Sequence, residues 1–142
     1  MHKSFYASGF LYSLKTHKIL LLQSEQKDDQ ASVWSTIGGE SKGGEDARAT
    51  FQRIISELLN LNLKEKNIFP VYDYFHDKLD KINYVFYGEV GADEKFVSPK
   101  HNTFSWLGFA ETIKLLFPAH TKQDLIVGER VVNAKWRLSQ GF

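Results

Sequence analysis

Glycines and charged residues gather in one segment of the chain, GGESKGGEDARATFQRIISELLNL, which runs from Gly38 to Leu61. Glycines let a backbone approach a ligand closely, and a glycine-rich turn before a helix can present free N–H groups to an anion. Arg53 and Glu57 lie four residues apart, so they can pair on one face of a helix. The segment therefore has the parts of a phosphate-binding loop and helix. It also fits a plainer interpretation, a flexible loop followed by a surface helix with a solvated ion pair.

The residues from Glu45 to Leu61 have the periodicity of an amphipathic helix. At about 100° per residue, their apolar side chains fill an arc from about 160° to about 320°, and the polar ones lie from about 20° to about 140°. Ile54 and Leu58 extend the apolar arc beside Glu57. We therefore expect one wide face of this helix to be buried, with charged residues along its border.

Runs of β-branched and aromatic residues lie on both sides of this helix. They predict one hairpin with a turn at residues 15–18 and a second with a turn at residues 77–81. A short strand is expected within residues 33–39, where it runs into a glycine turn, and another within residues 103–109.

Two helical segments complete the chain. A short helix is expected to stop before Pro118, and a C-terminal helix is expected over about residues 121–137, with Thr121 as its N-cap. The order of strands, helix, strands, helix and helix is typical of an α+β sandwich on a mixed β-sheet, and not of an alternating parallel sheet. We expect a single domain over residues 1–142.

The composition is that of a globular protein, and it excludes several classes of function. The chain has 142 residues, 42% hydrophobic, with no cysteine and a formal net charge of +1. Disulfides and zinc–thiolate sites are therefore excluded, which fits a reducing compartment such as the cytoplasm. The sequence contains no dense run of Lys and Arg, so we do not expect binding to a nucleic acid lattice. No signal peptide is expected, and no apolar run is long enough to span a membrane.

Taken together, these spacings resemble the Nudix box, G-x5-E-x7-R-E-U-x-E-E-x-G-U, where U is aliphatic. Gly39, Glu45, Arg53 and Glu57 stand at matching positions. The lead-in VWSTIGG and the later TFSWLGFAETIKLLFP are similar to segments that flank the box in this family, so the resemblance covers roughly residues 4–118. It implies a Nudix-type α/β/α sandwich.

The resemblance also implies an activity, the metal-dependent cleavage of a nucleoside diphosphate linked to another moiety. It assigns the catalytic positions to Glu57, Arg53 and Glu45, with the last two orienting the helix and the loop. It assigns Mg²⁺ or Mn²⁺ to Glu57 and to the carbonyl of Gly39. Glu40 directly follows the double glycine and is a candidate substitute ligand of that metal ion. A nucleotide-type small molecule is then the expected partner, and a homodimer is consistent with the family.

The chain departs from the box at two of its three metal-binding carboxylates. Those positions hold Ile54 and Leu58, and the glycine near the helix end is replaced by Asn60, which tolerates the left-handed conformation that a helix end requires. A further acidic position of the family falls on Lys100. We therefore expect weak activity, because Mg²⁺ requires several oxygen ligands in near-octahedral geometry.

Other residues have both a functional and a structural interpretation. An acid outside the helix could replace a missing ligand or could be a solvated surface group; these acids are Glu40, Glu89, Asp93, Glu94 and Glu111. Aromatic residues of the second hairpin could stack on a nucleobase or form strand core; these are Tyr72, Tyr74, Phe75, Tyr84, Phe86 and Tyr87. His76 could be a turn residue or a phosphate contact, and the turn is favoured. Trp106 is expected in the core, and Trp136 in the core or at a dimer contact.

Two functions are therefore consistent with the sequence. One is a divergent Nudix hydrolase with weak turnover. The other is a catalytically inactive Nudix-fold module that binds a nucleotide or a protein partner. An unrelated sandwich with a coincidental box is a third and weaker interpretation, against which the flanking segments argue.

Overall fold

A computed structural model describes residues 4–24, 33–92, 96, 102–115 and 117–139 of the chain. Its elements, in chain order, are β1 (Tyr6–Ser13), β2 (Ile19–Ser24), β3 (Val33–Ser35), β4 (Ile37–Glu40), α1 (Ala47–Leu59), a 3-10 turn (Glu65–Asn67), β5 (Ile68–His76), β6 (Lys81–Val90), β7 (Asn102–Leu107), α2 (Phe109–Thr112) and α3 (Ala119–Ser139). Both predicted hairpins are confirmed, as β1–β2 and β5–β6.

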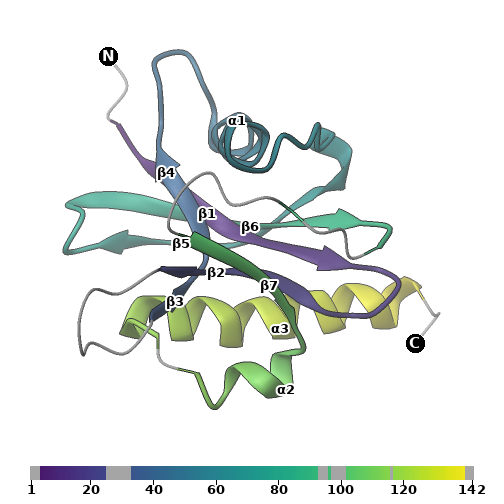
Figure 1. The fold of residues 1–142 in the computed structure, drawn as a ribbon. Helices are drawn as coiled ribbons and strands as arrows, with labels where there is room; N and C mark the ends of the chain where they lie inside the picture. Colours follow the sequence, from purple (N-terminus) through teal and green to yellow (C-terminus); the bar gives the residue numbers. More distant parts are fainter. Residues whose placement is uncertain (1–3, 25–32, 93–95, 97–101, 116, 140–142) are drawn as a thin grey trace.

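In the described part of the chain, seven strands form one mixed sheet with β1 near its centre. β1 pairs with β6 in parallel along its whole length. On its other side, the first half of β1 pairs with β4 and the second half with β2, both antiparallel. β2 and β4 therefore lie on the same side of β1 but beside different halves of it. From β4 the chain continues toward α1. Figure 1 shows α1 above the sheet and α3 with α2 below it, so the fold is the α/β/α sandwich that the sequence predicts.

Alternating side chains of the central strands fill two separate cores, one under each helical layer. In β1, Ala7 and Leu11 pack in the cluster that contains α1, whereas Phe10 and Tyr12 pack in the cluster that contains α3. β2 and β6 divide their apolar residues in the same way. Because both faces of these strands are buried, their sequences read as nearly continuous apolar runs.

The ends of α1 are set by local hydrogen bonds. Asp46 is the N-cap, and its Oδ1 accepts from the Ala49 N–H at 2.8 Å. Asn60 ends the helix in the left-handed conformation, with φ 54° and ψ 37°. The helix therefore spans Ala47–Leu59, inside the predicted range of Glu45 to Leu61, and Glu45 lies in the loop before it.

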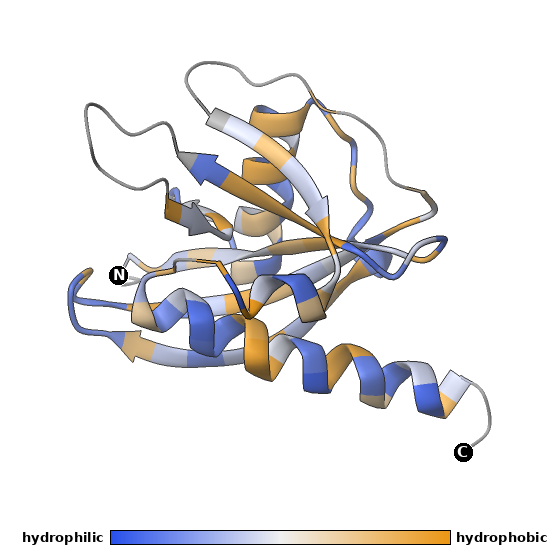
Figure 2. Ribbon diagram, turned by 60° about the horizontal axis from the view of Figure 1, so that its bottom comes forward, coloured by the Kyte–Doolittle hydropathy of each residue, from blue (hydrophilic) through white to orange (hydrophobic). Residues whose placement is uncertain are grey.

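α3 lies across the opposite face and is attached through a buried carboxylate. Asp124 is 2% exposed, and its two oxygens accept hydrogen bonds from the hydroxyls of Tyr72 at 2.7 Å and Tyr74 at 3.2 Å. Burial raises the pKa of Asp124 to about 6. Gly128, one turn further, lets the helix approach Phe10, because a Cβ there would lie 2.7 Å from that ring. Figure 2 shows hydrophilic and hydrophobic residues alternating along α3, and its exposed side chains include Ile126 at 47% and Leu138 at 75%.

Three local predictions need correction. The segment around residues 33–39 forms two strands, β3 and β4, and Gly38 and Gly39 are extended residues of β4 that pair with β1 instead of forming a turn. α3 begins at Ala119, so Thr121 lies inside the helix and is not its N-cap. The second helix is limited to Phe109–Thr112.

Trp106 and Trp136 lie in different environments. Trp106 is partly buried and packs against the α1-side core, as expected. Trp136 is 47% exposed on α3, so it is not part of either core. None of the described helices combines the length and the apolar character needed to cross a membrane.

The raised pKa of Asp124 predicts an unusual pH dependence of stability. Its ordinary value is 3.8 and its folded value is about 6, so the folded state holds a proton there that the unfolded chain has released. The contribution of Asp124 to stability should therefore fall as pH rises from about 4 to about 6, by on the order of 3 kcal/mol. Thermal unfolding should be measured for Asp124→Asn and for the wild type across this range. The melting temperature of the variant should rise relative to that of the wild type as pH rises. Asp73→Asn, at an exposed acid of β5, is the control; an equal gain there would contradict the assignment.

Candidate functional site

The loop and helix singled out by the sequence lie against the β4 edge of the sheet. Gly39 permits this approach, because a Cβ at its position would lie 3.0 Å from Cδ1 of Ile54. In the loop between β4 and α1, Gly44 has a positive φ of 84° and so requires the conformational freedom of glycine. The glycines thus serve two different purposes, close packing at Gly39 and chain reversal at Gly44.

Arg53 joins the loop to the helix. Its Nε donates to Glu45 Oε2 at 2.6 Å, and its Nη2 donates to Glu45 Oε1 at 3.2 Å and to the backbone carbonyl of Glu40 at 2.8 Å. The Arg53 and Glu45 side chains are 21% and 18% exposed, so this bidentate pair is largely shielded from solvent. The i,i+4 partner Glu57 is a weaker contact, at 3.4 Å from Nη1.

Glu45 is held from three sides. Besides Arg53, the N–H of Lys42 donates to Oε1 at 2.9 Å and the Thr50 hydroxyl donates to the same oxygen at 3.0 Å. The hydrogen bond from Arg53, followed by those from Lys42 and Thr50, lowers the pKa of Glu45 to about 2. A carboxylate committed in this way organises the loop and has little capacity left to bind an ion.

Glu57 is the carboxylate of the helix that remains open to solvent. Its side chain is 57% exposed, with Arg53 Nη1 at 3.4 Å and Lys42 Nζ at 3.8 Å. Glu40, by contrast, is directed toward β6, where its Oε1 meets Lys81 Nζ at 2.6 Å. Among the residues that the structure describes, neither Glu57 nor Glu40 belongs to a group of three or more ligand atoms close enough to share a metal ion.

The two replaced carboxylate positions lie in or against the core. Ile54 is 8% exposed and belongs to the buried cluster under α1, and Leu58 packs against the same cluster. Both side chains therefore contribute apolar burial where the Nudix box has glutamates. The apolar arc predicted from the sequence agrees with this placement.

The other acids that the sequence analysis weighed have structural partners where they can be described. Glu89 pairs with Lys135 Nζ at 2.9 Å, and Glu111 accepts from the Gly108 N–H at 3.0 Å at the start of α2. Asp93, Glu94 and Lys100 lie outside the described residues.

An open pocket of about 700 Å³ adjoins the loop. Phe5 and Tyr84 line it together with Lys42 and the loop glycines, and the two rings meet edge to face with centroids 5.4 Å apart. Sequence reasoning included Tyr84 among several aromatic candidates and missed Phe5. The missed signal lies in the pairing of β1 with β6, which brings together residues 79 positions apart.

A family model for the NUDIX domain matches residues 5–127. The chain belongs to the Nudix family. Among curated proteins we found no match.

Solved structures share the fold at low sequence identity. The E. coli ORF135 protein has a TM-score of 0.71 at 18% identity, with 94% of each chain covered. A C. elegans Ap4A hydrolase has a TM-score of 0.68 at 16% identity, over 91% of this chain and 98% of that chain. A chain in the complex between the C-terminal domain of mouse MUTYH and human PCNA has a TM-score of 0.66 at 12% identity, over 93% of this chain and 91% of that chain. At these identities the similarity establishes the fold alone.

The lowered pKa of Glu45 predicts that this residue stabilises the folded protein near neutral pH and loses that effect at acidic pH. The ordinary value is 4.5 and the folded value is about 2, so the contribution is complete above about 4.5 and is lost as pH falls toward 2. Glu45→Gln should therefore lower the melting temperature near neutral pH, and the difference from the wild type should shrink steadily between these two pH values.

Glu65→Gln, at an exposed acid outside the loop, is the matched control and should show no such trend. A Glu45→Gln difference that stays constant from neutral pH to pH 2 would show that Arg53 does not stabilise the ionised carboxylate.

Proposed function

We propose that the protein is a divergent Nudix hydrolase that cleaves a nucleoside diphosphate linked to another moiety, with slow turnover. The observation that carries the proposal is the intact connection of Arg53 to Glu45 and to the Glu40 carbonyl, beside an accessible carboxylate at Glu57. A chain that had lost the site entirely would have no need to keep this arrangement next to a pocket.

The donor atoms fit one weakly held divalent ion. Glu57 supplies an accessible carboxylate, and the Gly39 carbonyl supplies a second oxygen in the family's arrangement. Glu40 is less suitable, because its carboxylate would have to leave Lys81. Mg²⁺ or Mn²⁺ would complete its coordination with water and with phosphate oxygens of the substrate. When bound, such an ion neutralises charge on the diphosphate and so eases the attack of water.

The residues of the site would divide the remaining tasks. Arg53 holds Glu45 and the end of β4 in place and keeps a hydrogen bond on Glu57. Lys42, 67% exposed and 3.8 Å from Glu57, can offset negative charge of a bound phosphate. Glu57 is the one of these acids placed to accept a proton from an attacking water.

The pocket supports a nucleotide-type substrate. The rings of Phe5 and Tyr84 offer an apolar wall for a base, and Lys42 and the loop backbone lie in the same pocket. A nucleotide has these two parts, a flat aromatic base and an anionic tail. We infer this class of substrate and no particular member of it.

A binding module without turnover is the second candidate. The observation that favours it is the burial of Ile54 and the packing of Leu58, which leave a single family carboxylate on α1. Such a module would retain the pocket and the Arg53 framework for a nucleotide or a protein partner.

Turnover separates the two candidates. The pure protein is incubated with a panel of nucleoside diphosphate derivatives, with Mg²⁺ and with Mn²⁺, and released phosphate-containing products are measured. The hydrolase predicts metal-dependent turnover that falls at least about tenfold in Glu57→Gln, which corresponds to about 1.4 kcal/mol of transition-state stabilisation. Glu65→Gln is the control and should leave the rate unchanged.

Turnover that persists undiminished in Glu57→Gln would exclude this site. Absence of turnover, combined with a melting temperature that nucleotide still raises, would support the binding module instead.

A further inference from the structure

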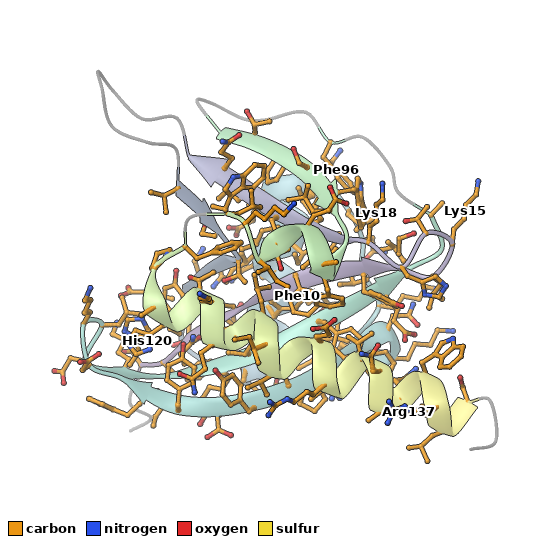
Figure 3. All side chains as sticks on the ribbon, turned by 90° about the horizontal axis from the view of Figure 1, so that it is seen from below. Phe10, Lys15, Lys18, Phe96, His120 and Arg137 are labelled. Carbon is orange, nitrogen blue, oxygen red and sulfur yellow. The ribbon has the colours of Figure 1, made fainter. Side chains whose placement is uncertain are left out.

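A group of metal-ligating side chains lies on the far side of the sheet from α1. His76 ends β5, Asp77 begins the turn to β6, and His120 stands in the first turn of α3. One ligand atom from each of the three residues lies within 4.8 Å of the others. Figure 3 shows His120 at the end of α3 that faces the β5–β6 turn.

The two histidines are brought together by contacts that do not depend on a metal. Their ring centroids lie 4.1 Å apart, and the His120 ring stacks on Tyr74 at 5.5 Å with planes 10° apart. Tyr74 also donates to Asp124, one turn further along α3, which fixes the start of this helix over β5. His76 Nδ1 accepts from the Leu79 N–H at 3.3 Å, which orients the His76 ring toward its own turn.

The spacing suits a small divalent transition-metal ion. His120 Nε2 and Asp77 Oδ1 are 3.2 Å apart. Ligand atoms about 2.0–2.1 Å from a tetrahedral Zn²⁺ lie roughly 3.3 Å from each other. Asp77 is 77% exposed and can adjust, and solvent can supply further ligands.

The donor types select the class of ion. Two imidazole nitrogens and one carboxylate suit Zn²⁺ and its neighbours in the first transition row, whereas Mg²⁺ prefers oxygen ligands alone.

We propose that His76, Asp77 and His120 bind a zinc-type divalent ion that ties the β5–β6 turn to the start of α3. The site is built from residues 43 and 44 positions apart in the chain, so an ion there would cross-link the hairpin to the helix. It uses none of the residues of the Arg53 loop. Zinc binding at this site can therefore be tested independently of any hydrolase activity.

Zinc binding to the full chain tests the proposal directly. Isothermal titration with Zn²⁺, and thermal unfolding with and without it, are compared for the wild type, His76→Gln, His120→Gln and the double variant. The wild type should bind one ion and gain melting temperature. Each single variant should lose more than about tenfold in affinity, the loss seen even when an outer-shell partner of a metal site is removed.

His17→Asn is the matched control, since His17 lies in the β1–β2 turn with a positive φ of 61° that Asn tolerates. It should keep wild-type zinc affinity. Absence of zinc binding in the wild type, or binding of equal affinity in the double variant, would overturn the proposal. The three residues would then make only the contact between the two histidine rings and the contact between His120 and Asp77.

A second measurement covers variants that fail to fold. Long-range ¹H–¹⁵N spectra of the wild-type imidazoles, recorded as Zn²⁺ is added, should show the largest shifts at His76 and His120. Shifts confined to the other histidines would overturn the proposal.

Discussion

The hydrogen bonds of Arg53 hold the functional end of this molecule together. One guanidinium joins the Glu45 side chain in the loop and the carbonyl of Glu40 at the end of β4, and it reaches Glu57 one turn along α1. The loop is also held at Ser41, whose N–H donates to the Phe5 carbonyl at 2.8 Å, and at Lys42, whose N–H donates to Glu45 Oε1 at 2.9 Å. Because a planar guanidinium can satisfy several acceptors at once, the strand end, the loop and the helix keep one relative position. Residues 41–47 of this segment line the pocket beside Phe5 and Tyr84, so the position of the loop shapes that pocket.

Beside this framework, two positions of α1 at which the Nudix box has glutamates are apolar. Ile54 and Leu58 fill apolar space under α1, and Gly39 makes room for Ile54. Buried carboxylates in these places would carry a large desolvation cost unless an ion compensated it. If the protein has the function proposed above, apolar residues at these positions stabilise the fold and weaken ion binding, the usual direction of exchange between stability and activity. This explains how a Nudix-family chain can combine a well-packed box helix with a poor set of metal ligands.

Patterns of short range could be predicted from the sequence, and arrangements of long range could not. The period of 3.6 residues identified α1, and the left-handed Asn60 ends it as that residue type allows. The pairing of Gly38 and Gly39 with β1 was missed, because glycines usually signal turns and only the partner strand makes them extended. Asp124 falls within the expected C-terminal helix, but nothing near it in the sequence shows that two tyrosines some 50 residues away bind its carboxylate in the core. His76 was expected in a turn, and its proximity to His120 follows only from how α3 crosses the sheet.

In the proposed hydrolase, Ile54 and Leu58 limit the rate of catalysis, whereas the Arg53 framework does not. Replacing both together, Ile54→Glu with Leu58→Glu, should lower the melting temperature without Mg²⁺, because two charges enter the core side of α1. The same variant should raise Mg²⁺-dependent turnover of the nucleoside diphosphate panel by at least about tenfold. An isosteric control, Ile54→Gln with Leu58→Gln, should lose stability without gaining turnover. A glutamate variant that stays folded, binds Mg²⁺ and gains no turnover over the wild type would show that Ile54 and Leu58 do not limit catalysis.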